Sequence, residues 1–182
     1  MTDARMSEAE VSLRLAVHLA SSGRATTSIS VAIDGAQVKV GQTEHFSIAA
    51  FMRQLGWLAE STTPRWQGVY VNPKASVQIH VHSKSGLGDV TTTLGTGHMF
   101  IAEAKKGPLT RSKSSAEYPL LREALGQLLT IKEVPDNALL AVAVPAGERF
   151  RELAERWRNA PLILRTGIRI LTVAPSGAIE GW

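Results

Sequence analysis

Two acidic residues and a lysine near the middle of the chain are the residues best suited to chemistry. Asp89 opens one alternating segment, and Glu103 and Lys105 end a second one. A Gly-Thr-Gly turn centred on Thr96 lies between the two segments, which predicts an antiparallel hairpin. Residues at equal distances from the centre of a symmetric hairpin face each other, so we expect Asp89 to lie opposite Glu103.

Such a pair needs a positive partner. Two carboxylates whose Cβ atoms lie ~5 Å apart repel each other unless a cation lies between them. Lys105 shares the face of Glu103 because side chains alternate along a strand. A Mg²⁺ ion, for which Mn²⁺ can substitute, would lower the pKa of a bound water and polarise a phosphoryl oxygen, while the lysine would support the developing charge. These residues therefore predict hydrolysis of phosphodiester bonds.

The same residues resemble the pattern of the PD-(D/E)XK superfamily, the restriction-endonuclease-like nucleases. The resemblance rests on Asp89, on the segment from Phe100 to Lys105 and on the order helix, acid, E-x-K strand, helix. It implies a Mg²⁺-dependent DNA endonuclease with Asp89 and Glu103 as metal ligands and Lys105 as the catalytic lysine. Gly88 departs from the pattern, in which a proline precedes the acid.

The resemblance also implies two residues on helices. The family often carries an acid on its first helix that faces the metal, which predicts Glu10 as a third ligand, with Glu8 as the second choice. It often carries a glutamine on the helix after the E-x-K strand, and Gln127 matches it. Gln127 also falls on the expected apolar side of its helix, where an amide needs a polar partner. The alternatives are a capping box with Ser7 for Glu10 and a satisfied core amide for Gln127.

Basic residues lie around the predicted site. Lys106, Arg111 and Lys113 follow the catalytic lysine in one loop, and Lys84 precedes the hairpin. Such side chains contact phosphates without reading sequence, so we expect them to bind nucleic acid. DNA is favoured over RNA only through the resemblance. The alternative is an ordinary solvated loop.

Two other classes of function stay open. A non-catalytic module of the same fold would bind nucleic acid or a protein, with the acids and the lysine separated or paired with each other. A small-molecule metal enzyme would use His80 and His82, which share one face of a strand but lack a third ligand at a recognisable spacing. Trp66 and Tyr70 either stack on unpaired bases or pack a long loop.

The chain divides into segments of helical and alternating hydrophobic spacing. We expect helices over residues 7–22, 45–58, 118–131 and 148–158, and strands over residues 28–33, 36–40, 77–81, 89–94, 98–104, 137–144, 162–164 and 168–173, with the first two strands joined as a hairpin at Asp34-Gly35. This order predicts an α/β fold: a single domain over residues 1–182 with a central mixed β-sheet flanked by α-helices, as in restriction-endonuclease-like proteins.

The composition limits the classes of function, site and location that this protein can have. The 182 residues are 44% hydrophobic and 20% charged, with a net charge of +4, which permits a polyanionic partner without requiring one. The absence of cysteine excludes disulfides, thiolate zinc sites and cysteine nucleophiles. With no long apolar run and no signal-peptide pattern, we expect a cytoplasmic protein without a membrane partner. A homodimer and a partner protein that supplies specificity are both compatible with the sequence.

Overall fold

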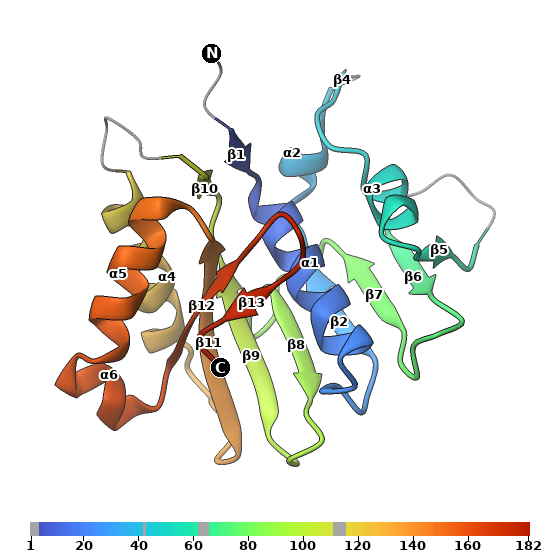
Figure 1. Cartoon of the computed structure of the whole chain (residues 1–182). Coiled ribbons are helices and arrows are strands. Elements are labelled where there is room, and N and C mark those ends of the chain that lie inside the picture. The colour runs from blue at the N-terminus through green and yellow to red at the C-terminus, as the bar shows by residue number, and fades with distance from the viewer. Residues whose placement is uncertain (1–3, 42, 62–65, 111–115) are drawn as a thin grey trace.

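The computed structural model describes residues 4–41, 43–61, 66–110 and 116–182, which form an α/β fold (Figure 1). Among these residues, nine strands form one mixed sheet in the order β13-β12-β11-β9-β8-β2-β7-β6-β5. Two further sheets of two strands each pair β1 with β10 and β3 with β4. No helix in the described part of the chain is both long and apolar enough to cross a membrane.

The bounds of the elements are as follows. The helices are α1 (Glu8–Ser21), α2 (Gly35–Val38), α3 (Ile48–Gln54), α4 (Glu117–Leu129), α5 (Glu148–Arg158) and α6 (Pro161–Thr166). The strands are β1 (Arg5–Met6), β2 (Ile29–Ala32), β3 (Lys39–Val40), β4 (Thr43–Glu44), β5 (Leu58–Ala59), β6 (Gly68–Val71), β7 (Ile79–His82), β8 (Val90–Thr93), β9 (Met99–Ala104), β10 (Gly107–Pro108), β11 (Ala138–Pro145), β12 (Arg169–Val173) and β13 (Ile179–Glu180).

Helices cover the two faces of the large sheet unequally. Helix α1 packs across one face, against strands from β7 to β12, whereas α4 packs against β9 and β11 and α5 against β12. Alternation along β9 divides the core: Phe100 and Ala102 belong to the cluster that includes α1, and Ile101 belongs to the cluster that includes α4 and α5. Figure 1 shows α4, α5 and α6 gathered at one side of the sheet and β2, β7 and β6 at the other.

The predicted hairpin and its register are confirmed. Strands β8 and β9 pair antiparallel, with Val90 opposite Ala102 and Thr93 opposite Met99. The Asp89 N–H donates to the Ala102 carbonyl at 2.9 Å, so pairing continues to the residue before β8. The predicted strands and helices that follow the hairpin, over residues 118–131, 137–144 and 148–158, correspond to α4, β11 and α5.

The predicted hairpin over residues 28–40 is wrong. The Asp34 side chain accepts a hydrogen bond from the Ala36 N–H at 3.0 Å and thereby caps the short helix α2. Asp34 has a φ of −62°, whereas a tight two-residue hairpin turn of the expected type needs positive φ at both central positions. Strand β2 instead pairs with β7 in parallel and with β8 antiparallel.

Two other predictions differ from the structure at helices. The expected strand over residues 162–164 is wrong, because Pro161 begins helix α6 and Gly167 ends it with a φ of 70°. The expected helix over residues 45–58 is limited to α3, since Gly56 follows it with a φ of 80° and Trp57 turns into the core.

The first helix generates a stability prediction. The Ser7 side chain accepts a hydrogen bond from the Glu10 N–H at 3.1 Å and caps α1. We expect Ser7→Ala to lower the free energy of unfolding by about 1 kcal/mol, measured by urea denaturation, because that N–H loses its partner. The control is Ser76→Ala at an exposed turn, and an equal effect of the two substitutions would contradict the capping role.

Candidate functional site

The structure brings Asp89 and Glu103 together at the end of the β8–β9 hairpin. Their side chains are close enough to share a hydrogen bond. The Asp89 Oδ2 atom also accepts a hydrogen bond from the Ala104 N–H at 2.8 Å, which fixes the orientation of this carboxyl group. The predicted proximity of the two acids is therefore present, and their role as metal ligands stays a prediction.

Gly88 allows this approach. A Cβ atom on Gly88 would lie 2.9 Å from the Ala102 carbonyl oxygen and 2.9 Å from the Ile101 Cγ2 atom. Such contacts are too short, so any side chain at this position would push the chain away from β9. The departure from proline noted in the sequence thus has a steric reason in this protein.

Burial and nearby negative charges disfavour ionisation of the two acids. Burial raises the pKa of Asp89 to about 6, and the nearby Glu8 charge adds to this effect. Burial also raises the pKa of Glu103 to about 7, and the negative charge of Asp89 raises it further. Lys105 lowers the pKa of both groups, but not enough to offset burial. The raised pKa values mean that ionisation of both acids is unfavourable, and a cation between the two carboxyl groups would offset this cost.

Lys105 is a buried cation among carboxylates. Only 4% of the residue is exposed. Its Nζ atom lies 3.2 Å from the Glu123 Oε1 atom on α4 and 3.9 Å from the Glu8 Oε2 atom on α1. Two helices on opposite faces of the sheet thus hold the ammonium group beside the acidic pair, which is how a buried charge is tolerated.

Glu8, and not Glu10, is the acid of the first helix that reaches the site. Glu8 contacts Lys105 and raises the pKa of both Asp89 and Glu103. Glu10 instead pairs with Arg14, with its Oε1 atom 2.8 Å from the Arg14 Nη2 atom. Residues two apart on a helix point in nearly opposite directions, so both cannot face the same site. The structure therefore does not support the prediction of Glu10 as a metal ligand.

Gln127 does not lie on the apolar side of its helix, so that prediction is wrong. The residue is exposed, and the buried stripe of α4 consists of Glu117, Leu121, Ala124 and Leu128. Glu123, one turn before Gln127, supplies the side chain that reaches Lys105. Glu123 was not expected at the site, because Gln127 on the next turn of the same face matched the family pattern.

Gln37 is a second residue near the site that was not predicted from the sequence. Its Nε2 atom donates to the Glu8 Oε1 atom at 3.3 Å, and its Oε1 atom accepts from the Ala9 N–H at 3.0 Å. Gln37 thus links α2 to the start of α1 and orients Glu8. No signal in the sequence indicated this contact, because the segment was expected to be a strand.

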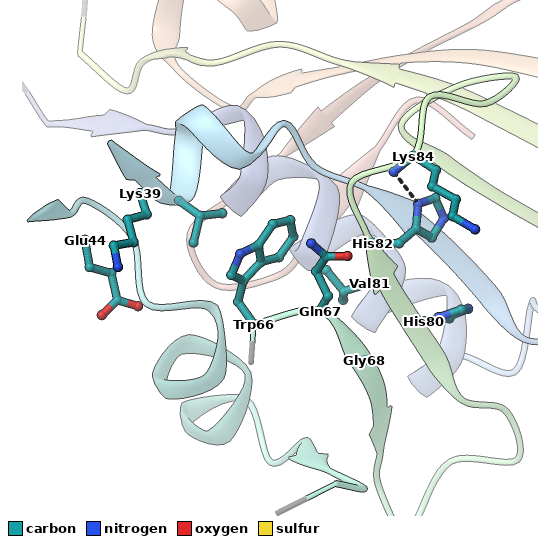
Figure 2. A pocket seen from close by; sticks show the side chains of 10 residues that line it. Lys39, Glu44, Trp66, Gln67, Gly68, His80, Val81, His82 and Lys84 are labelled. Carbon is teal, nitrogen blue, oxygen red and sulfur yellow. Dashed lines mark hydrogen bonds between the residues drawn. The ribbon is translucent and has the colours of Figure 1, made fainter. Parts of the chain in front are cut away.

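The predicted nucleic-acid contacts are only partly described. Lys106 and Lys84 are exposed, as phosphate-binding residues should be. Arg111 and Lys113 lie outside the described residues. Lys84 lines a cavity of about 1020 Å³ together with His80 and His82 (Figure 2).

The donor set fits a hard cation better than zinc. Within the described ranges, no group of three or more His, Cys, Asp or Glu side chains is gathered closely enough to hold a metal ion. Mg²⁺ needs fewer protein ligands because it keeps several waters, and the Asp89–Glu103 pair offers it two carboxyl groups.

The histidine pair is a poor zinc site. His82 has its Nε2 atom 2.7 Å from the Ser30 Oγ atom and its Nδ1 atom 3.2 Å from the Lys84 backbone nitrogen, so neither ring nitrogen is free for a metal. This arrangement argues against the small-molecule metal enzyme that would use His80 and His82.

Comparisons with known proteins add no identification. No family model, no curated protein and no solved structure matches this chain. The class of protein is therefore inferred from the fold and the site alone.

The close contact at Gly88 can be tested by a substitution that adds a single methyl group. We expect Gly88→Ala to lower the free energy of unfolding by about 1–3 kcal/mol, measured by urea denaturation, because backbone and Ile101 must move. Gly86→Ala is the matched control, since a Cβ atom there would meet nothing within 4 Å. Equal stability of the two variants would show that Gly88 does not constrain the hairpin.

The carboxyl pair predicts a dependence of stability on pH in metal-free protein. A carboxyl group with a raised pKa binds its proton more tightly in the folded state, so its contribution to stability is present below its unfolded pKa and is lost as pH rises through its folded pKa. The window runs from about pH 4 to about pH 7.

The measurement compares thermal unfolding of the parent and of Glu103→Gln at pH 5 and at pH 8 in the presence of a chelator. We expect the variant to gain stability relative to the parent at the higher pH, because the repulsion of Asp89 is removed. Glu10→Gln is the control. A constant difference between parent and Glu103→Gln at both pH values would contradict the raised pKa.

Proposed function

We propose that this protein is a Mg²⁺-dependent nuclease that hydrolyses phosphodiester bonds, with DNA as the favoured substrate and internal bonds as the favoured position. The observation that carries the proposal is the buried Asp89–Glu103 pair with Lys105 beside it. Paired carboxyl groups with raised pKa values and a buried lysine are typical of functional sites. The burial of two adjacent carboxyl groups is costly, which favours a functional role over a merely structural one.

The arrangement around the site supports the restriction-endonuclease-like form of the fold. Helix α1 precedes the sheet, the hairpin of β8 and β9 carries the acids and the lysine, and α4 follows and leads to β11, which is parallel to β9. This is the order that the resemblance implies. The observed fold class is α/β with a large mixed sheet, and the finer assignment is part of the proposal.

The residues of the chain would divide the work as follows. Asp89, oriented by the Ala104 N–H, and Glu103 would hold the cation. When bound, Mg²⁺ lowers the pKa of a coordinated water and polarises a phosphoryl oxygen. The Lys105 ammonium group would donate hydrogen bonds to the phosphoryl group as negative charge develops on it. Glu8 and Glu123 keep this ammonium in place and act as positioning residues.

Metal binding would also remove the repulsion inside the site. Asp89 and Glu103 must lose any shared proton before both can coordinate a cation, so binding releases protons. Affinity for Mg²⁺ is therefore expected to rise with pH across the window in which the two acids ionise. This coupling distinguishes a cation site from a merely structural carboxyl pair.

One observation favours a second candidate, the non-catalytic binding module of the same fold. Lys105 already has two carboxylate partners, in Glu123 at 3.2 Å and in Glu8 at 3.9 Å. In a binding module this pairing would be permanent, and the protein would bind nucleic acid or a protein partner without cutting. In a nuclease, a bound phosphate competes with Glu123 for the ammonium group.

A cleavage assay tests the proposal. The substrates are single-stranded, duplex, branched and supercoiled DNA and RNA, each with Mg²⁺ or Mn²⁺ and with a chelator. We expect cleavage that requires the metal and that falls at least about 100-fold in Glu103→Gln and in Lys105→Ala, because each removes a charge from the reacting centre. Both variants must unfold as cooperatively as the parent.

The two acids of the first helix provide a matched pair of variants. Glu8→Gln should lower the cleavage rate, because Glu8 positions Lys105, and Glu10→Gln should leave it unchanged, because Glu10 pairs with Arg14. Salt-sensitive DNA binding without cleavage by the parent, retained by Glu103→Gln and Lys105→Ala, would favour the binding module.

A further inference from the structure

One half of the large sheet has a face without a helix above it among the described elements. On β2, β7 and β8, Val31, Val81 and Val90 are buried under α1. The residues between them point to the opposite face and are exposed or half-buried: Ser30, Ala32, His80, His82, Thr91 and Thr93. On that face, α4 and α5 cover β9, β11 and β12. The acids therefore lie at the border between a covered and an open part of the sheet.

A row of register partners leads from the acids across this open face. The Ala32 N–H donates to the Asp89 carbonyl at 2.8 Å, and Ala32 pairs with His82 on β7. Since neighbouring strands lie ~4.8 Å apart, His82 is ~10 Å from Asp89 along the row. Ala32, the residue between them in this row, has a small side chain.

The row ends at a cavity of about 1020 Å³ that His82 helps to line. Figure 2 shows the Trp66 ring at its centre, with Lys39 and Glu44 on one side and Gln67 and His82 on the other. Lys39 and Glu44 are register partners of β3 and β4. A cavity of this size accommodates a ligand as large as a nucleotide.

Two side chains at the mouth of the cavity remain available for a ligand. The His82 ring is held by Ser30 and by the Lys84 backbone N–H, so it anchors the turn that carries Lys84. Lys84 is exposed and forms no ion pair within the described part of the chain. His80 is exposed and contacts His82 only edge to face, at 5.5 Å between ring centroids.

We propose that this cavity binds an unpaired nucleotide of the same DNA strand whose phosphodiester bond lies at Asp89 and Glu103. Lys84 and His80 contact the phosphate, and the base stacks on Trp66. The inference rests on the proposed function for the position of the scissile bond, and it names the substrate class: single-stranded DNA, or duplex DNA with an unpaired segment beside the cut. Lys84 and the half-buried Trp66 ring line the same cavity, and a positive side chain together with an aromatic ring is the chemistry that single strands require.

A binding assay tests the cavity independently of cleavage. The probes are a fluorescein-labelled single-stranded oligonucleotide and the blunt duplex of the same sequence, with Ca²⁺ in place of Mg²⁺. We expect the parent to prefer the single strand, and Lys84→Gln and Trp66→Ala to raise its Kd about 10-fold through loss of a phosphate contact and of stacking. Trp66→Phe should restore most of the affinity, and Lys74→Gln, an exposed lysine outside the cavity, should change nothing.

Crosslinking tests the position of the strand. The probe is an oligonucleotide with one 5-iodo-2′-deoxyuridine. It should crosslink to the segment that contains Trp66 when the modified base lies within a few nucleotides of the bond that the protein cleaves in the presence of Mg²⁺. In Lys84→Gln, KM should rise and kcat should stay at the parent value, because Lys84 binds the strand outside the reacting centre.

The outcomes separate the two proposals. One outcome is that the parent cuts DNA and that all three variants bind and cut DNA as well as the parent: Lys84→Gln, Trp66→Phe and Trp66→Ala. The cavity inference is then wrong and the nuclease proposal stands. If the parent binds the blunt duplex at least as tightly as the single strand, the choice of an unpaired nucleotide is wrong. If the parent cuts nothing with any metal while Lys84→Gln loses single-strand binding, the nuclease proposal is wrong and the cavity is still a nucleotide site.

Discussion

The register of one hairpin forces two carboxyl groups into contact, and the rest of the site is arranged around that contact. Asp89 and Glu103 have no freedom to separate, because Asp89 is tied to β9 through the Ala102 carbonyl and the Ala104 N–H. Gly88 makes the approach sterically feasible. Burial raises the pKa values of both carboxyl groups, because it disfavours their charged forms. A positive charge nearby stabilises the charged forms. Lys105 lowers the pKa of both acids, but both pKa values stay above their usual range.

The position of Lys105 shows how the fold supports this unfavourable charge cluster. Its ammonium group is almost fully buried and is contacted by Glu8 from one side of the sheet and by Glu123 from the other. Removing either helix contact would leave a buried cation with less compensation, which is strongly destabilising in general. The two helices are thus joined electrostatically through the end of β9, and the site is part of what holds the two layers together.

The uneven covering of the sheet gives the site its access. Helices lie on both faces from β9 to β12, where the strands are apolar on both sides, as expected for a buried parallel sheet. From β8 to β7 the strands alternate between buried valines and small or polar residues, so they need cover on one face only. The acids lie where one pattern changes to the other. A polar surface that begins at a candidate phosphodiester site is well suited to a strand of nucleic acid.

Features that depend on neighbours along the chain could be predicted from the sequence. The alternation around Thr96 predicted the register that places Asp89 opposite Glu103. The capping residue Ser7 predicted the start of α1. Both effects act over a few residues. Which helix side chains reach the site depends instead on how each helix packs against the sheet. Glu8 rather than Glu10, and Glu123 rather than Gln127, contact Lys105. The packing of α1 sets which of two nearly opposite side chains faces the site, and the packing of α4 sets which turn of that helix lies beside Lys105. The same holds for Gln37 and for the cavity around Trp66, which join segments far apart in the chain and leave no local pattern in it.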